Sequence, residues 1–341
     1  MAASSKSAPS AARARACFPD VDAGTGHYES FYLKAAHPSE PLAVWIRYTV
    51  HKPPGAVAHG SLWFTLFDGG AEGPTASKIT LEPEELAAGA GDYIRVGDSH
   101  FGPASVAGRA DSERGDAAWE LAFESGEAPY RHLSRDWMYG APVPRTKLES
   151  PHPAARFTGW VEAGGRRIEL DGWPGMVGHN WGEQHAERWI WMHGAGFDGH
   201  GDDTWLDAAF GRIKLGPVTA PWIGNARLAL DGSYHRLGGI ERVLSTEVGE
   251  TPRGCDFVLP AKEVTVFGSV LAEPKDRVGW VYADPDGSEH HTVNCSIARM
   301  RLTVRRRGAA DVLLESPSGA TYELGMRERD HGVAIQPFPD G

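Results

Sequence analysis

The sequence predicts an all-β protein, on three observations. Short apolar or alternating segments recur along most of the chain. Gly and Pro punctuate these segments throughout, with 42 Gly and 24 Pro among 341 residues. Neither a β-α-β rhythm nor a fixed-period repeat is present. Many antiparallel hairpins of this kind are typical of barrels or sandwiches, and the length suits one large or two medium domains.

The predicted elements follow one another as strand, turn and strand. In the first half, strands are expected at His27–Lys34, Leu42–Val50, Ser61–Phe67 and Trp119–Glu124, with a hairpin over Phe157–Leu170. In the second half, hairpins are expected over Asn225–Leu237, Val278–Val293 and Asp311–Leu324, the last turning at residues 316–319. The one helical candidate is the short segment Pro83–Ala88.

Two of these strands have informative patterns. Leu42–Val50 alternates, so that Trp45, Arg47 and Thr49 share one face. Ser61–Phe67 is apolar on both faces, which predicts a strand that lies between two cores.

Charge and cysteine content restrict the partners and the compartment. The net charge of −11 disfavours binding to a phosphate backbone, so no nucleic-acid partner is expected. The three cysteines Cys17, Cys255 and Cys295 form no disulfide framework, which favours a reducing, cytoplasmic location. The first residues lack the apolar run of a secretory signal, and no segment reaches the roughly 20 apolar residues of a membrane span.

The most informative segment is rich in tryptophan. Seven of the twelve Trp fall between Trp160 and Trp222. Within Arg188–Phe197, strand alternation places Trp189, Trp191 and His193 on one side. After a turn, the returning strand places Trp205 and Asp207 on one face. This hairpin is expected to present three indoles, an imidazole and a carboxyl group to one cavity.

This combination of side chains is suited to acid–base chemistry at an alkene. A carboxyl group against aromatic walls loses solvation, and its pKa rises until it can remain protonated near neutral pH. A neutral carboxylic acid can protonate an alkene, and aromatic faces stabilise the resulting carbocation. A histidine can then take the proton back or activate water. The alternative is structural: Trp on strands usually packs in a core, and His193 or Asp207 can be hydrogen-bonded core residues.

One box of residues carries a family resemblance. Gly178-His179-Asn180-Trp181-Gly182, followed by Trp189-Ile190-Trp191, resembles the carotenoid 1,2-hydratases (hydroxyneurosporene synthases), the AttH-like proteins and the tocopherol cyclases. The resemblance implies two lipocalin-like antiparallel β-barrels in tandem with little helix. The expected division is a disordered tail over 1–20, an N-terminal barrel over 21–185 and a C-terminal barrel over 186–341.

The resemblance also implies site residues, with one departure. His179, Asn180 and Trp181 are carried over by their position in the box. The family often has Asp immediately before the box, where this chain has Gly178. If that Asp is the usual acid of the family, this chain has either another acid, with Asp207, Glu183 and Glu187 as candidates, or a different chemistry. The alternation argument adds Trp189, Trp191 and Trp205 to the substrate wall, with Asp207 as proton donor and His179 or His193 as base.

Two other groups of histidines do not match a known site pattern. His179, His185 and His193 have neither the spacing of HExxH nor that of a zinc finger, so no metal is expected. His290, His291 and Cys295 follow a predicted turn, which indicates a solvated strand end.

The sequence thus leads to three hypotheses. The first is a cofactor-independent hydratase, dehydratase or cyclase that acts on an apolar isoprenoid, either a terpenoid or a prenylated compound. The second is a non-catalytic carrier or sensor for the same class of ligand. The third is a structural protein with an unused cavity. The identity of the substrate and the oligomeric state are not specified by the sequence.

Overall fold

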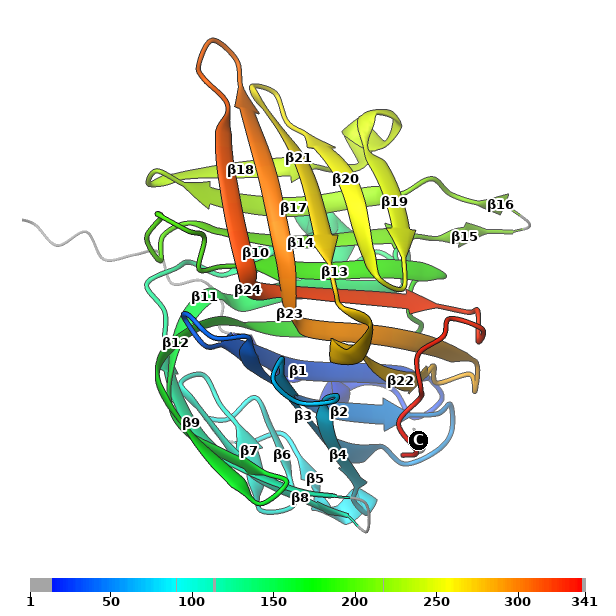
Figure 1. Ribbon diagram of the computed structural model, residues 1–341. Helices are drawn as coiled ribbons and strands as arrows, with labels where there is room; N and C mark the ends of the chain where they lie inside the picture. The colour runs from blue at the N-terminus through cyan, green and yellow to red at the C-terminus, as the bar shows by residue number, and fades with distance from the viewer. Residues whose placement is uncertain (1–13, 90, 113–114, 217, 339–341) are drawn as a thin grey trace, which may run out of the picture.

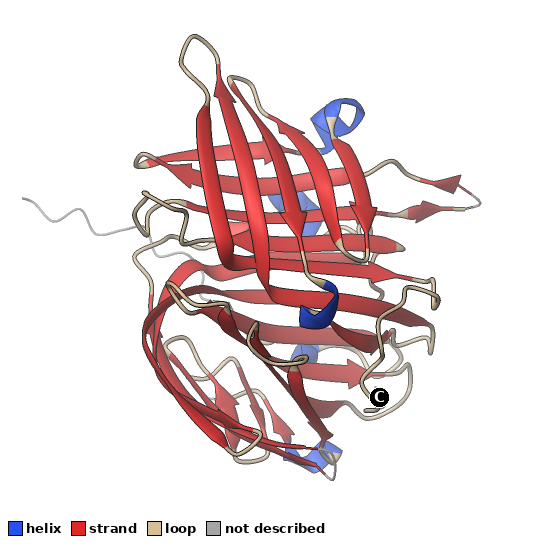
Figure 2. Ribbon diagram, in the orientation of Figure 1, coloured by secondary structure: helices blue, strands red, loops and turns tan. Residues whose placement is uncertain are grey.

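The computed structural model describes residues 14–338, except 90, 113–114 and 217. Two large antiparallel sheets, each strongly curled, account for most of the chain (Figure 1). Among the described residues, helix is limited to short 3-10 turns, seen in blue in Figure 2. The predicted all-β class is confirmed.

The first sheet has 12 strands and occupies the lower half of Figure 1. Its order is β4-β3-β2-β1-β12-β11-β9-β8-β7-β6-β5, with β10 paired to β11. The strands are β1 (His27–Ala36), β2 (Leu42–Lys52), β3 (His59–Asp68), β4 (Thr75–Thr80), β5 (Leu86–Ala87), β6 (Ile94–Val96), β7 (Ser99–Phe101), β8 (Ser105–Ser112), β9 (Gly115–Glu124), β10 (Tyr130–Arg131), β11 (Thr146–Ala163) and β12 (Arg166–Gly182). The sheet curls until β4 lies against β8 and β9.

The second sheet has 10 strands in the order β18-β17-β14-β13-β24-β23-β21-β20-β19, with β22 paired to β23. These are β13 (Arg188–Gly194), β14 (Trp205–Arg212), β17 (Ile223–Leu230), β18 (Ser233–Gly238), β19 (Glu247–Thr251), β20 (Gly254–Pro260), β21 (Val264–Leu271), β22 (Val278–Ala283), β23 (Glu289–Arg306) and β24 (Val312–Met326). A small third sheet pairs β15 (Lys214–Leu215) with β16 (Val218–Thr219). The 3-10 turns are η1 (Phe18–Asp20), η2 (Pro83–Glu85), η3 (Asp136–Tyr139), η4 (Ile240–Ser245) and η5 (Pro274–Asp276).

The two sheets share a central interface. Strands β1, β2 and β3 are buried along nearly their whole length, and β23 and β24 lie against them. On β3, Phe64 packs in the core of the first sheet, whereas Trp63 and Phe67 join the core that includes the second sheet. The expectation that this strand lies between two cores is confirmed. It is apolar on both faces because each face meets a different apolar layer.

Two local expectations need correction. The predicted helix at Pro83–Ala88 is only the turn η2, which passes directly into β5. Residues 316–319 do not reverse the chain, because they form an irregularity within β24, where Ser316 Oγ bonds to the carbonyl oxygen of Ala195. The reversal between β23 and β24 instead lies at residues 307–311, where Gly308 has a φ of 75°.

Part of the predicted disordered tail packs against β1. The backbone N–H groups of Cys17 and Phe18 donate to the buried carboxylate of Glu29, at 2.8 Å each to their nearer oxygens. A buried carboxylate needs such donors, and this requirement fixes the segment from Cys17 to η1. Residues 1–13 of the predicted tail lie outside the described residues.

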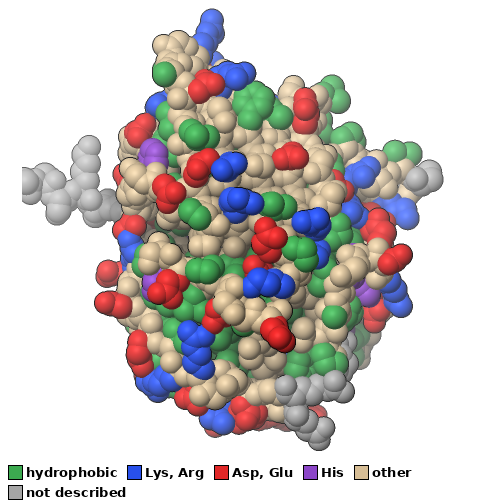
Figure 3. Space-filling model, in the orientation of Figure 1, with side chains coloured by type: hydrophobic (Ala, Val, Ile, Leu, Met, Phe, Trp, Pro, Cys, Tyr) green, Lys and Arg blue, Asp and Glu red, His purple; other side chains and the backbone are tan. Residues whose placement is uncertain are grey.

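Surface charges are mixed. On the face drawn in Figure 3, basic and acidic side chains are interspersed over both sheets. Within the described part of the chain, none of the helices has the length and hydropathy needed to cross a bilayer.

The pairing of β1 with β12 places Tyr32 directly opposite Gly178. The Tyr32 ring lies across the glycine, and a Cβ atom added at position 178 would overlap that ring. This aromatic cover over a strand glycine fixes the position of Tyr32.

We predict that Gly178→Ala destabilises the protein by about 1–3 kcal/mol, the usual cost of overpacking a filled site. Thermal unfolding followed by circular dichroism measures the change. The double variant Gly178→Ala with Tyr32→Leu should recover part of the loss, because the shorter side chain leaves room for the methyl group. This account would be contradicted if the loss of stability in the double variant equalled the sum of the losses in Gly178→Ala and Tyr32→Leu measured separately.

Candidate active site

A cavity of about 560 Å³ lies between the two sheets. The first sheet lines it with residues of β1, β2 and β12, and the second sheet with residues of β13, β14, β17, β22 and β24. The segment from His132 to Leu148 forms a further wall. In this segment Trp137 lines the cavity while remaining 69% exposed, so this segment contributes the rim. The volume is within the range of small-molecule sites.

Aromatic side chains dominate the cavity wall. Trp189 and Trp191 come from β13, Trp45 from β2, Tyr32 from β1 and Tyr282 from β22. Between the two sheets Tyr32 meets Trp191 edge-on at 5.1 Å between centroids, and within the second sheet Trp189 stacks with Tyr282 at 6.0 Å. The space is therefore suited to an apolar ligand with accessible π faces around it.

One carboxylate, Glu323 on β24, belongs to this wall. It accepts hydrogen bonds from Trp189 Nε1 at 3.0 Å, from the Tyr282 hydroxyl at 3.2 Å and from Asn294 Nδ2 at 3.1 Å. These three hydrogen bonds hold the Glu323 side chain in the cavity wall beside the rings of Trp189 and Tyr282.

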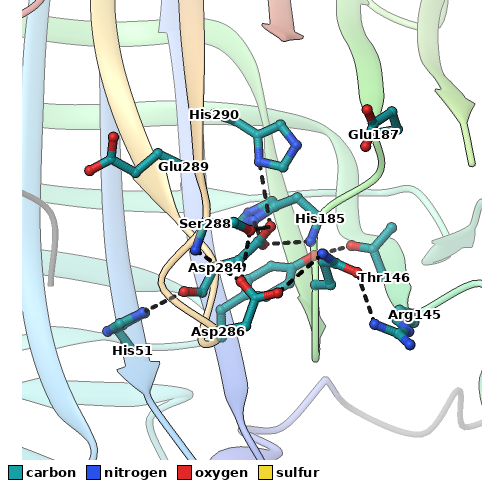
Figure 4. A network of polar contacts seen from close by, with 12 residues as sticks. His51, Arg145, Thr146, His185, Glu187, Asp284, Asp286, Ser288, Glu289 and His290 are labelled. Carbon is teal, nitrogen blue, oxygen red and sulfur yellow. Dashed lines mark hydrogen bonds and ion pairs between the residues drawn. The ribbon is translucent and has the colours of Figure 1, made fainter. Parts of the chain in front are cut away.

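A histidine–aspartate pair, His185 with Asp284, is shown in Figure 4. His185 follows β12 in the chain and lines the cavity, whereas Asp284 directly follows β22. His185 Nδ1 and the His185 backbone N–H both bond to Asp284 Oδ1, at 2.7 Å each. Burial raises the pKa of Asp284, but the hydrogen bonds and charge of His185 outweigh it and lower the pKa below its usual value.

The other ring nitrogen of His185, Nε2, is buried and is unpaired among the described residues. The ring is held flat between Tyr28 and Trp189, at 3.8 and 5.2 Å between centroids. An imidazole oriented by a carboxylate at Nδ1, with Nε2 free at a cavity wall, has the geometry of a general acid or base.

His290 is not at a solvated strand end, and that expectation is wrong. It is fully buried on β23, with Nδ1 at 3.5 Å from Asp284 Oδ2. Burial, followed by the neighbouring His185, lowers the pKa of His290 to about 3. Figure 4 shows His290 and His185 both directed toward Asp284. The neutral ring of His290 contributes bulk and excludes water without adding a competing charge.

Three of the residues expected at the site line the cavity: Asn180, Trp189 and Trp191. Asn180 Oδ1 accepts a hydrogen bond from Ser30, which also lines the cavity. The position where the resembled family often has Asp is Gly178, two residues before Asn180. The ring of Tyr32 lies over that position.

His179 and Trp181 lie on the opposite face of β12 from Asn180, outside the cavity lining. The His179 ring stacks between Phe31 and Trp181, at 4.0 and 4.4 Å. Its nitrogens bond to Glu29 at 2.7 Å and to Glu149 at 3.3 Å. Burial opposes the charge of His179, but these carboxylates outweigh it and raise the pKa. The geometry is that of a structural ion pair.

The expected acid, Asp207, is also outside the cavity lining. It is fully buried on β14, with Ser150 Oγ at 2.5 Å and His132 Nε2 at 3.2 Å. Desolvation raises the pKa of Asp207, but the charge and hydrogen bond of His132 outweigh it, so the pKa is lowered. The expectation of a raised pKa is therefore wrong, because the polar neighbours were not visible in the strand pattern.

His193 and Trp205 share the sheet face of Asp207, but neither lines the cavity. His193 Nε2 bonds to the carbonyl oxygen of Pro153 at 2.9 Å. Burial, with the nearby Lys34 charge, lowers the pKa of His193 to about 4. Trp205 Nε1 bonds to Glu127 at 3.3 Å. The expected cluster of three indoles, an imidazole and a carboxyl group is thus divided between two environments.

Two groups among the described residues combine side chains of metal-ligand type: Cys17 with Glu29 and His179, and His185 with Asp284 and His290. In each group the candidate atoms lie within 4.8 Å of one another. Glu29 already accepts five hydrogen bonds from Cys17, Phe18, His27 and His179, which satisfy its charge. In the second group the nitrogen atoms of His290 have no hydrogen-bond partner among the described residues.

Comparisons with known proteins agree with this architecture. The chain matches the tocopherol cyclase-like family over residues 152–320. This match confirms the resemblance stated from the sequence. The chain is 28% identical over 297 residues to an uncharacterised protein of Mycobacterium tuberculosis, covering 86% of this chain and 85% of that protein. It is also 28% identical to the chloroplastic tocopherol cyclase of Zea mays over 105 residues, which are 29% of this chain and 22% of that enzyme.

The fold has a relative among solved structures. An AttH-like protein of Nitrosomonas europaea superposes with a TM-score of 0.56 at 14% sequence identity, covering 94% of this chain and 99% of that one. This similarity extends over both sheets, and it supports the lipocalin-like architecture expected from the resemblance.

Sequence reasoning missed several wall residues, although some signals were present. Arg47 is a charged residue in the middle of an apolar strand, which is unusual unless the charge has a partner or a ligand. Asp284 lies in the predicted hairpin Val278–Val293 and Glu323 in the predicted hairpin Asp311–Leu324, where no local pattern marks either as a site residue. Asp284 bonds to His185, about 100 residues earlier in the chain, and Glu323 lines the same cavity from about 140 residues beyond His185.

The His179 pair generates a prediction on stability. Burial raises the pKa of Glu29, but hydrogen bonds from His179 and His27 outweigh it and lower the pKa to about 2. The stabilisation by the ionised carboxylate is therefore present above its unfolded pKa, near 4.5, and is lost as the pH falls toward 2. We expect Glu29→Gln to lower the free energy of unfolding by about 3–5 kcal/mol at neutral pH.

Chemical denaturation between pH 2 and 7 measures this effect. Between the folded and unfolded pKa values of Glu29, about 2 and 4.5, the free energy of unfolding of the variant should change less with pH than that of the wild type. Glu120→Gln, on the exposed side of β9, is the matched control. A parallel pH profile for Glu29→Gln and the wild type would contradict the ion-pair assignment.

Proposed function

We propose that this protein catalyses a cofactor-independent acid–base reaction at a carbon–carbon double bond of an apolar, isoprenoid-type molecule. The reaction adds water, removes it, or closes a ring by adding a hydroxyl group of the same molecule. The observation that carries the proposal is His185, held at Nδ1 by Asp284 and free at Nε2 beside an aromatic wall.

His185 is the proposed proton carrier. In its protonated form, Nε2–H delivers a proton to one alkene carbon, and the positive charge forms on the neighbouring carbon. Water or an internal hydroxyl oxygen then attacks that carbon, and the released proton returns to Nε2. The reaction consumes no oxidant or reductant, and the carboxylate of Asp284 stabilises the imidazolium in each cycle.

The cation would be stabilised by the wall described above. The π faces of Trp189, Trp191 and Tyr282 attract a positive charge, and the Glu323 carboxylate adds a fixed negative charge. Glu323 accepts three donors from the protein, so it is preorganised as a stabilising charge. This division of roles replaces Asp207 as proton donor and His179 or His193 as base.

The substrate class is supported by two independent observations. The cavity lining is mostly apolar and aromatic, as an isoprenoid chain requires. The matched family bears the name of tocopherol cyclase, a name that refers to ring closure on an isoprenoid compound.

We predict that His185→Gln lowers turnover by about 10²–10⁴-fold, because the proton carrier is removed while the ring-sized polar side chain is kept. Purified protein is incubated in heavy water with linear prenyl alcohols and prenylated phenols, and mass spectrometry detects deuterium on a former alkene carbon. Asp284→Asn should also lower turnover, because it removes the carboxylate that holds His185. His200→Gln, in the loop between β13 and β14, is the matched control.

A non-catalytic carrier gives a different result. In that case ligands would bind with the same affinity to the wild type and to His185→Gln, and every recovered ligand would be unlabelled. That outcome would reject catalysis and retain the cavity as a binding site.

Metal removal tests cofactor independence. We expect turnover to survive dialysis against EDTA, since the proposed steps use side chains alone. Loss of turnover that added Zn²⁺ restores would contradict the proposal. It would assign a metal to the group formed by His185, Asp284 and His290.

A further inference from the structure

The cavity wall contains hydrogen-bond donors without acceptors. Arg47 Nη1, Trp45 Nε1 and Trp191 Nε1 are buried, and none has a hydrogen-bond partner among the described residues. All three residues line the cavity, and each is at least 95% buried. A buried N–H group without an acceptor costs free energy, and three of them around one cavity require an explanation.

The three unpaired donors belong to both sheets and line the same cavity. Trp45 and Arg47 are two residues apart on β2 and therefore share a face. Arg47 pairs across the strands with Tyr32, whose ring contacts Trp191 of the second sheet. An acceptor placed between the sheets at this point would lie close to donors from two independent elements.

Arg47 also has an unpaired charge. Its guanidinium lies over the Tyr282 ring at 3.9 Å and near the Trp63 ring at 5.3 Å from the centroids. No carboxylate of the described residues forms an ion pair with it, and Glu323 is occupied by donors from Trp189, Tyr282 and Asn294. Aromatic faces compensate a buried cation only in part, and a missing counter-charge is costly.

We propose that the molecule bound in this cavity carries an anionic oxygen, such as a carboxylate, which docks on Arg47. The indole N–H groups of Trp45 and Trp191 supply further donors. The inference rests on the proposed function and adds to it a substrate class: an apolar chain that ends in an acidic group. Arg47 binds that group, which fixes the position of the chain relative to His185.

The test compares two ligands with the same skeleton. Farnesoic acid and farnesol share a C15 isoprenoid chain and differ at the head group. Calorimetric titration at neutral pH should show the acid binding to the wild type about tenfold more tightly, or better, since a charge-assisted hydrogen bond is stronger than a neutral one. Quenching of tryptophan fluorescence gives a second readout, because the donors include two cavity indoles.

Variants separate the role of Arg47 from the cavity itself. Arg47→Met should remove the preference for the acid and leave the affinity for farnesol within about twofold. Arg47→Lys should retain part of the preference, because it keeps the charge without the planar fork. Arg109→Met, which removes an exposed arginine paired with Asp111, is the matched control and should behave as the wild type.

Stability provides an independent measurement. Without ligand, Arg47→Met should unfold at the same temperature as the wild type or higher, because an uncompensated buried charge is removed. A lowered unfolding temperature would instead assign Arg47 a structural role and overturn the inference.

The remaining outcomes are distinct. Equal affinity of the wild type for both ligands, or an acid preference that persists in Arg47→Met, overturns this inference and leaves the proposed function intact. Binding of neither ligand to the wild type overturns the inference and the isoprenoid part of the proposed function together.

Discussion

The structure depends on one constraint: strands β1, β2 and β3 have an apolar layer on each face. One face closes the core of the first sheet, and the other meets the second sheet. Polar groups between the sheets are removed from water, so they must bond to one another, to backbone atoms or to a ligand. The cavity lies where the two sheets do not fill the space between them.

Polar groups near this interface fall into two kinds. Around His179 both ring nitrogens bond to carboxylates, and Asp207 Oδ2 bonds to Ser150 and His132, although Asp207 Oδ1 has no hydrogen-bond partner among the described residues. Such buried pairs join strands from distant parts of the chain. Around His185 and Arg47 the bonding is incomplete, with nitrogen atoms left free at the cavity wall. Incomplete bonding in a buried, preorganised setting is where binding and proton transfer can occur.

Strand alternation correctly grouped Trp189 with Trp191, and it placed Trp45 and Arg47 on one face. It failed for Trp205 and Asp207, which share a sheet face with the cavity indoles but lie in a different environment. Alternation decides which side of a strand a residue occupies and says nothing about its position along the interface. Of the site residues expected from the motif Gly178–Gly182, only Asn180 faces the cavity.

The sequence by itself determined the all-β class, most of the strands, the two-faced burial of β3 and the family resemblance. Each of these follows from local periodicity or from a short contiguous motif. The tertiary structure alone decided which polar groups form the site. His185, Asp284, Glu323 and Arg47 come from distant parts of the chain and meet only when the two sheets pack. Whether a buried imidazole or carboxylate is satisfied or free depends on neighbours supplied by another sheet, and so does its pKa.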